Sequence, residues 1–174
     1  SAATAKYTTD LTQLGREGRL RENPSFDKET VRLIEVLAKD GEKQPVILDE
    51  TGEAQAHVVD QLALRIAKNN VPKQLQDITV LKLETAALFS NLVSEKELEA
   101  ATSAIVDTAV ASDRKVILFV DKLQNFVASN RLIQAIRDGK LSIIGGATSL
   151  AYSDKIESDP EIAALFVPIV SDGI

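Results

Sequence analysis

Cysteine, methionine and tryptophan are absent from this sequence, and histidine occurs once, at His57. Without cysteine the chain has no disulfide and no thiolate metal site. A single histidine also argues against a histidine-rich metal centre or a histidine-based catalytic triad, so we expect no metal and interpret His57 as a packing or surface residue. The absence of methionine, including an initiator, predicts a fragment or processed piece of a longer protein.

Positive charge is scarce relative to negative charge, since 20 Lys and Arg against 26 Asp and Glu leave a net charge of −6. A nucleic-acid binder normally carries a basic face, so we expect no nucleic-acid partner. Long apolar runs are missing too. None approaches the roughly 20 residues of a membrane span, so we expect no membrane-spanning segment. Hydrophobic residues at 44% and charged residues at 26% are typical of one globular domain.

Helix and strand patterns alternate along the chain, which favours a mostly parallel sheet with helices on both faces. The strand candidates are residues 46–48, 79–83, 115–120, 141–144 and 166–170. The helix candidates are 11–20, 28–38, a run beginning near Gln55, 94–111, a segment around 132–136, and 150–157. The run 115–120 is the most apolar, so we place it at the sheet centre.

The segment 49–56 lies between a strand and a helix pattern, where a phosphate-binding loop would be expected. A working loop reads G-x-x-x-x-G-K-[ST]; its glycines let backbone N–H groups reach the phosphates, its lysine bridges them and its hydroxyl holds magnesium. Only the spacing of that loop remains here. The vestigial positions are Asp49, Glu50, Gly52, Ala54, Gln55 and Ala56, with Asp49 and Ala54 at the glycines, Gln55 at the lysine and Ala56 at the hydroxyl. Carboxylates at 49, 50 and 53 would face a phosphate.

In this order the pieces resemble the large subdomain of the first AAA+ module of Clp-type disaggregases and unfoldases. The resemblance covers nearly the whole chain, and it depends on the order and spacing of motifs that are weak singly. These are Tyr7-Thr8-Thr9-Asp10-Leu11-Thr12 with Gly18, Asn70-Val71-Pro72 with Leu75, the Walker B strand 116–121, Gly139-Lys140-Leu141 with Ile144-Gly145, and Tyr152, Ile156, Glu157, Asp159 and Phe166.

The resemblance implies the fold: a three-layer αβα P-loop NTPase, the AAA+ large subdomain, with a five-stranded parallel sheet ordered 5-1-4-3-2. Residues 1–174 would form this single subdomain, with 1–26 as its N-terminal segment. The helical lid subdomain would begin after Ile174, so we expect it to be absent. Clp relatives are cytoplasmic, which implies that location, although the composition also fits an exported protein.

The catalytic positions of the family are altered. Asp121 resembles the magnesium-organising aspartate, but Lys122 stands in place of the water-activating glutamate, and an ammonium cannot accept a proton from water. Ala164 and Leu165 replace two arginines, one of them the trans-acting finger. The hydroxyl of sensor 1 is left open among residues 147–149. We hypothesise that the Lys122 ammonium lies near Asp121 and the acidic loop and replaces the lost positive charge.

One further segment has two readings. The pore-loop tyrosine of relatives falls at Leu92, within the apolar run Leu88, Phe89, Leu92 and Val93. If exposed, this candidate interaction loop marks a partner surface; if packed, it belongs to the core.

These residues predict a non-catalytic pseudo-ATPase module that serves assembly or protein binding, with other AAA+ subunits or proteins as partners and no cofactor. The alternative is an ATP-binding and hydrolysing module of a Clp-type unfoldase with an atypical site, which would require ATP and Mg²⁺. A scaffold that forms no ring is a third reading.

Overall fold

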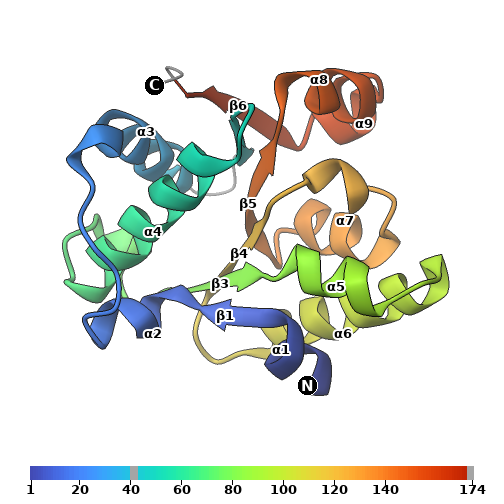
Figure 1. Ribbon diagram of the computed structural model, residues 1–174, viewed down its shortest axis with the longest axis horizontal. Coiled ribbons are helices and arrows are strands. Elements are labelled where there is room, and N and C mark those ends of the chain that lie inside the picture. The colour runs from blue at the N-terminus through green and yellow to red at the C-terminus, as the bar shows by residue number, and fades with distance from the viewer. Residues whose placement is uncertain (40–42, 172–174) are drawn as a thin grey trace.

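The computed structural model describes residues 1–39 and 43–171, which form one six-stranded sheet (Figure 1). The strand order is β1-β3-β4-β5-β2-β6. The strands are β1 (Thr8–Asp10), β2 (Gln44–Leu48), β3 (Thr79–Leu83), β4 (Val116–Val120), β5 (Ser142–Ala147) and β6 (Phe166–Val170). Only β1 is antiparallel to its neighbour, and the other pairs are parallel.

The prediction of a five-stranded, wholly parallel sheet is wrong, because β1 adds an antiparallel edge strand beside β3. Three residues are too few to show a period-2 pattern, and β1 joins the sheet through its backbone, with Thr8 opposite Leu83 and Asp10 opposite Leu81. The five parallel strands follow the order β3-β4-β5-β2-β6. If these five strands are numbered 1 to 5 along the chain, their order across the sheet is 2-3-4-1-5. Starting from the opposite edge of the sheet, this is the order 5-1-4-3-2 that the resemblance implied.

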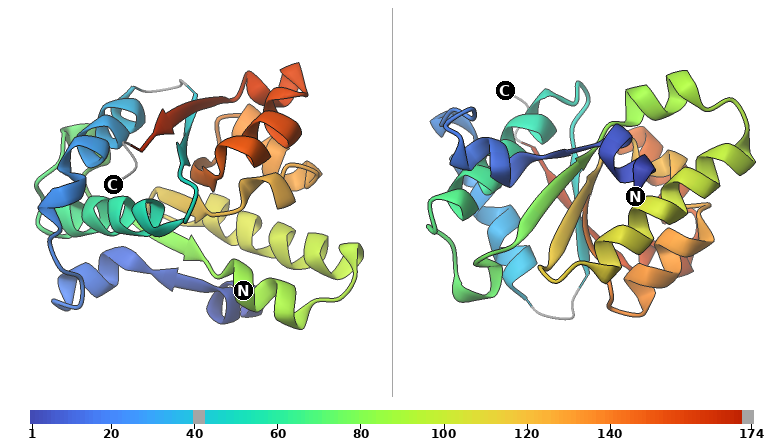
Figure 2. Two further views of the ribbon diagram at one scale, coloured as in Figure 1. Left: turned by 45° about the horizontal axis from the view of Figure 1, so that its top comes forward. Right: turned by 90° about the horizontal axis from the view of Figure 1, so that it is seen from below.

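Helices cover both faces of the sheet (Figures 1 and 2). One face packs against α2 (Leu11–Arg16), α3 (Asp27–Ala38) and α4 (Glu53–Ala67), and the other against α1 (Ala2–Tyr7), α5 (Thr85–Asn91), α6 (Glu95–Ala111) and α7 (Asn130–Arg137). The remaining helices are α8 (Ser149–Tyr152) and α9 (Pro160–Ala163). Short helical turns occur at η1 (Pro24–Phe26), η2 (Lys73–Leu75), η3 (Leu123–Asn125) and η4 (Ser153–Glu157). The result is a three-layer αβα arrangement.

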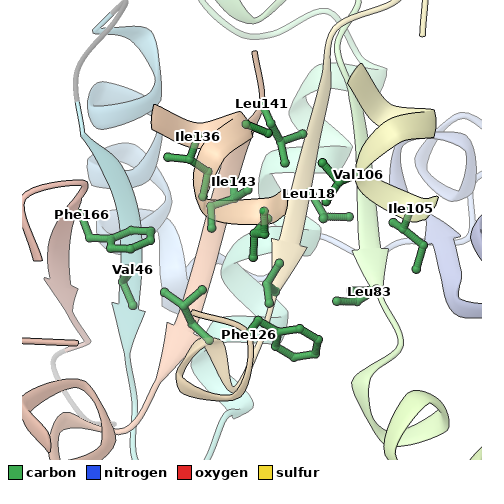
Figure 3. Close-up of a cluster of buried hydrophobic side chains, with 14 of the residues drawn as sticks. Val46, Leu83, Ile105, Val106, Leu118, Phe126, Ile136, Leu141, Ile143 and Phe166 are labelled. Atoms are coloured by element: carbon green, nitrogen blue, oxygen red, sulfur yellow. The ribbon is translucent and has the colours of Figure 1, made fainter. Parts of the chain in front are cut away.

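Strand β4 is buried on both faces, as its apolar sequence predicts. Val116, Leu118 and Val120 point into one core, while Ile117 and Phe119 point into the other. Figure 3 shows the first core, where strand side chains such as Leu118 meet Val106 of α6 and Ile136 of α7. In the described part of the chain, no helix is long and apolar enough to cross a membrane.

Truncation of Leu118 tests this double-sided core. Its side chain is 1% exposed, so we expect Leu118→Ala to lower the free energy of unfolding by about 2–5 kcal/mol, measured by urea denaturation. Val93→Ala is the control, because Val93 is 90% exposed and the change should stay within about 0.5 kcal/mol. Similar losses in both variants would contradict this account of the core.

Candidate functional site

A cleft of about 650 Å³ opens at the carboxyl ends of β2 and β6. Its walls come from the segment before α3, the loop between β2 and α4, the first turn of α4, the start of α8 and the end of β6. The lining residues are Asn23, Ser25, Phe26, Leu48, Asp49, Glu50, Thr51, Glu53, Ala54, His57, Ser149, Val170 and Ser171. This is the position at which ligands bind in open parallel sheets.

The loop at the floor of the cleft is closed by its own side chains. One oxygen of the Asp49 carboxylate accepts a hydrogen bond from the Ala54 N–H at 2.8 Å, and the other accepts from the Thr51 N–H at 3.4 Å. The Thr51 hydroxyl oxygen accepts from the Glu53 N–H at 3.2 Å. Backbone N–H groups at such a strand-to-helix turn are the donors that bind phosphate in a P-loop. Here a side-chain anion already occupies two of them.

The turn itself requires Gly52. This residue has φ +79° and stands immediately before α4, a backbone conformation that an L side chain adopts only with strain. The turn therefore requires a glycine at position 52, whether or not a phosphate binds.

The same loop is tied to the end of β5. Glu50 accepts a hydrogen bond from the Ser149 N–H at 3.2 Å, and the Asp49 N–H donates to the Ala147 carbonyl at 3.0 Å. Of the three sensor-1 candidates, Ser149 lines the cleft. The Thr148 hydroxyl accepts instead from the Ala151 N–H and so caps α8.

Gln55, at the lysine position, turns away from the cleft. Its side chain is 5% exposed, and its Nε2 donates to the Ala147 carbonyl at 3.5 Å. Its Oε1 lies against Gly146 of β5, where an added Cβ would come within 1.9 Å of that oxygen. Gln55 therefore packs between α4 and β5, and Ala56 beside it is exposed.

His57 and Phe26 form an aromatic pair in the cleft wall that the sequence did not predict. Their rings stack with centroids 5.1 Å apart and an interplanar angle of 13°. The His57 Nε2 also lies 3.8 Å from a Glu53 carboxylate oxygen, and its side chain is 39% exposed. The two aromatic residues are 31 positions apart, so no local sequence signal joins them.

The Walker B residues lie outside the cleft lining. The Asp121 carboxylate accepts a hydrogen bond from the buried Thr85 hydroxyl at 2.6 Å. Lys122 is exposed, has φ +51°, and forms no ion pair with any described residue. The hypothesis that its ammonium compensates the acidic loop stays a prediction. Among the described residues, Asp49 and Glu50 accept backbone N–H groups, and the Glu53 carboxylate lies 3.8 Å from His57 Nε2.

The remaining predicted positions lie apart from the cleft. Ala164 is exposed in the turn between α9 and β6, and Leu165 packs against the core. In the candidate interaction loop, two residues are packed and two are exposed. Leu88 is buried and Leu92 packs against the core, whereas Phe89 is 40% and Val93 90% exposed.

The contact between Gln55 and Gly146 predicts a specific coupling. Gly146→Ala should destabilise the fold by about 1–3 kcal/mol, because the added methyl group overlaps the Gln55 amide. Gln55→Ala removes that amide, so the double variant should recover part of the loss in a double-mutant cycle of unfolding free energies.

Gly145→Ala is the matched control for this cycle. A Cβ at Gly145 meets Leu123 and Val46, which Gln55→Ala leaves in place, so those two substitutions should add. Additive effects of Gly146→Ala and Gln55→Ala would contradict the packing described here.

Lys122 gives a second prediction. Because its backbone is left-handed, Lys122→Gly should raise the unfolding free energy by up to about 1 kcal/mol, whereas Lys122→Ala should leave the melting temperature nearly unchanged. A clear loss of stability in Lys122→Ala would support the charge-compensation hypothesis. Thermal denaturation of both variants decides between these outcomes.

Comparison with known proteins gives the family. A family model described as the SMAX1 nucleotide binding domain matches residues 20–153. The chaperone protein ClpB of Agrobacterium fabrum is 33% identical over 180 residues, which cover 98% of this chain and 21% of ClpB. ClpB of Yersinia enterocolitica is 32% identical over 176 residues, covering 95% of this chain and 20% of ClpB. The chain thus spans about a fifth of the length of these relatives.

Solved structures agree. The chain is similar to Hsp104 in a closed state with ATPγS and FITC casein, with a TM-score of 0.87, 26% identity, and coverage of 97% of this chain and 31% of that one. The Saccharomyces cerevisiae Hsp104–ADP complex gives a TM-score of 0.88 and 25% identity, covering 98% of this chain and 30% of that one. The chain therefore belongs to the SMAX1 nucleotide-binding-domain family and is a Clp-type AAA+ domain.

Proposed function

We propose that this domain is a non-catalytic Clp-type AAA+ module that has lost nucleotide binding and serves assembly or protein binding. The observation that carries the proposal is the hydrogen bond from the Ala54 N–H to the Asp49 carboxylate at 2.8 Å. A phosphate could use this N–H only by displacing a covalently attached carboxylate, whose local concentration is always high. The loop therefore supplies its own anion.

The charge of the cleft supports the same conclusion. Its lining contains the carboxylates of Asp49, Glu50 and Glu53, and among the described residues it includes neither lysine nor arginine. Two like charges about 4 Å apart repel by about 4 kcal/mol at an effective dielectric constant near 20. A triphosphate in this cleft would meet several such repulsions, and no lysine or arginine in the described lining would offset them.

The residues for hydrolysis are missing as well. Lys122 cannot activate water, and Ala164 and Leu165 cannot stabilise charge on a phosphate of a neighbouring subunit. Loss of an arginine finger alone costs about 10³–10⁵ in rate. ATP hydrolysis by this domain would therefore be negligible.

Protein binding is the function that remains for the fold. One of the similar Hsp104 structures contains casein, a protein substrate of that chaperone. In this domain, Phe89 in the last turns of α5 and Val93 in the connection from α5 to α6 expose apolar side chains. We assign the partner-contacting role to these two residues, while Leu88 and Leu92 anchor the segment to the core.

A titration with a fluorescent ATP analogue and Mg²⁺ tests the loss of nucleotide binding. We expect no saturable binding below roughly 1 mM, which corresponds to about −4 kcal/mol. A ClpB nucleotide-binding domain is the positive control. Saturable micromolar binding would overturn the proposal and favour the alternative, an ATP-dependent unfoldase module with an atypical site.

A further inference from the structure

A second pocket, of about 250 Å³, lies at the amino ends of the central strands and is lined by six basic residues. These are Lys39, Lys43, Arg114, Lys115, Arg137 and Lys140. The lining includes no carboxylate among the described residues. A concentration of six cations is unexpected in a chain whose net charge is −6.

Three separate connections bring these cations together. Lys39 and Lys43 come from the connection between α3 and β2, Arg114 and Lys115 from that between α6 and β4, and Arg137 and Lys140 from the end of α7 and the turn before β5. The connections meet because β4, β5 and β2 are consecutive in the sheet and parallel. The pocket thus results from the topology.

The pocket is separate from the cleft described above. Gln44 at the start of β2 lines the pocket, and Leu48 at the end of β2 lines the cleft. A strand rises about 3.3 Å per residue, so the four steps from Gln44 to Leu48 separate the two sites by roughly 13 Å. Figure 3 shows two apolar residues that also line the pocket, Ile136 and Leu141, at the end of the core away from Phe126.

The six cations have no carboxylate partners within the described residues. Elsewhere on the surface, basic side chains do pair: Arg65 with Asp27, Lys68 with Glu22, and Arg131 with Asp107. None of the six takes part in an ion pair or in a side-chain hydrogen bond with a described residue. Within residues 1–39 and 43–171, therefore, no carboxylate neutralises their positive charge.

A simpler explanation for the six basic residues is that they stabilise the negative ends of helix dipoles. The carboxyl ends of α3, α6 and α7 all point toward this edge of the sheet and attract cations. Each helix end carries only about half a negative charge, however, and its effect fades within the last turn. Only Arg137 lies in such a last turn. The six full charges exceed what the helix ends require.

We propose that this pocket binds a small, multivalent phosphate-type anion. Arginine and lysine are the usual ligands of phosphate oxygens, arginine through paired N–H groups and lysine as a point charge. The hydroxyls of Ser112 and Ser142 in the lining add neutral donors. The small volume fits a di- or triphosphate group better than a folded segment of another protein. This site does not depend on the proposed loss of nucleotide binding.

Isothermal titration calorimetry with tripolyphosphate on the whole chain, at an ionic strength of about 0.15 M where the Debye length is about 8 Å, tests the proposal. The pocket variant carries Lys43→Gln, Lys115→Gln and Lys140→Gln, one from each connection. It should bind at least about tenfold more weakly than the wild type, because charge-assisted hydrogen bonds to phosphate are lost. The control carries Lys73→Gln, Lys96→Gln and Lys155→Gln, which remove the same charge from exposed positions elsewhere. It should bind within about twofold of wild type, since distant surface charges are screened.

Several results would overturn the assignment: no binding by the wild type, equal weakening in the two variants, or tighter binding of an acidic peptide such as hexaglutamate than of tripolyphosphate. The last would assign the pocket to an acidic protein segment. Amide chemical-shift changes locate the ligand. Shifts at residues 139–142 support the pocket, whereas shifts confined to residues 49–54 would place the anion in the cleft and contradict both proposals.

Discussion

The central strands are buried on both faces, and this constraint confines polar chemistry to the two edges where those strands begin and end. Apolar residues of β2, β4 and β5 alternate between two cores, so side chains that a ligand could reach, such as Gln44 and Ser142, occur only at the strand ends. The carboxyl edge carries the acidic cleft, and the amino edge carries the basic pocket. The two edges therefore have opposite charge, although the chain as a whole is acidic.

At the carboxyl edge, the turn between β2 and α4 is closed by its own side chains. A helix that starts after a tight turn has N–H groups with no partner in the helix, and they require an acceptor. In a nucleotide-binding relative, a phosphate oxygen can be that acceptor. Here the Asp49 carboxylate accepts from the Ala54 N–H, and the Thr51 hydroxyl accepts from the Glu53 N–H. Glu50 accepts from the Ser149 N–H and so connects the loop to the start of α8. The substitutions at 49 and 50 are thus mutually consistent: they keep the turn stable while making the cleft acidic.

Much of the fold could be predicted from the sequence, because buried faces of helices and strands require apolar residues at regular spacings. The apolar run of β4 and the Ser94 cap of α6 were predicted correctly from the residues, whereas the five-stranded sheet was implied by the family resemblance and the sheet has six strands. The edge strand β1 was missed, since three backbone-paired residues leave no such pattern. At the site, the strand before Asp49 and the helix that contains Gln55 were predicted correctly. The role given to Lys122 stays a prediction, and its left-handed backbone was not predicted because residue types do not specify it.

Residue identities by themselves predicted that the family's catalytic groups are absent, because a glutamine cannot act as the P-loop lysine and an alanine cannot act as an arginine finger. Only the tertiary structure decided what replaced them. The pairing of Asp49 with Ala54, the stack of Phe26 on His57 and the meeting of six cations from three connections all join groups through folded geometry. Sequence periodicity reports which side of an element is buried, whereas contacts between elements depend on strand order and turn geometry, which the whole fold sets together.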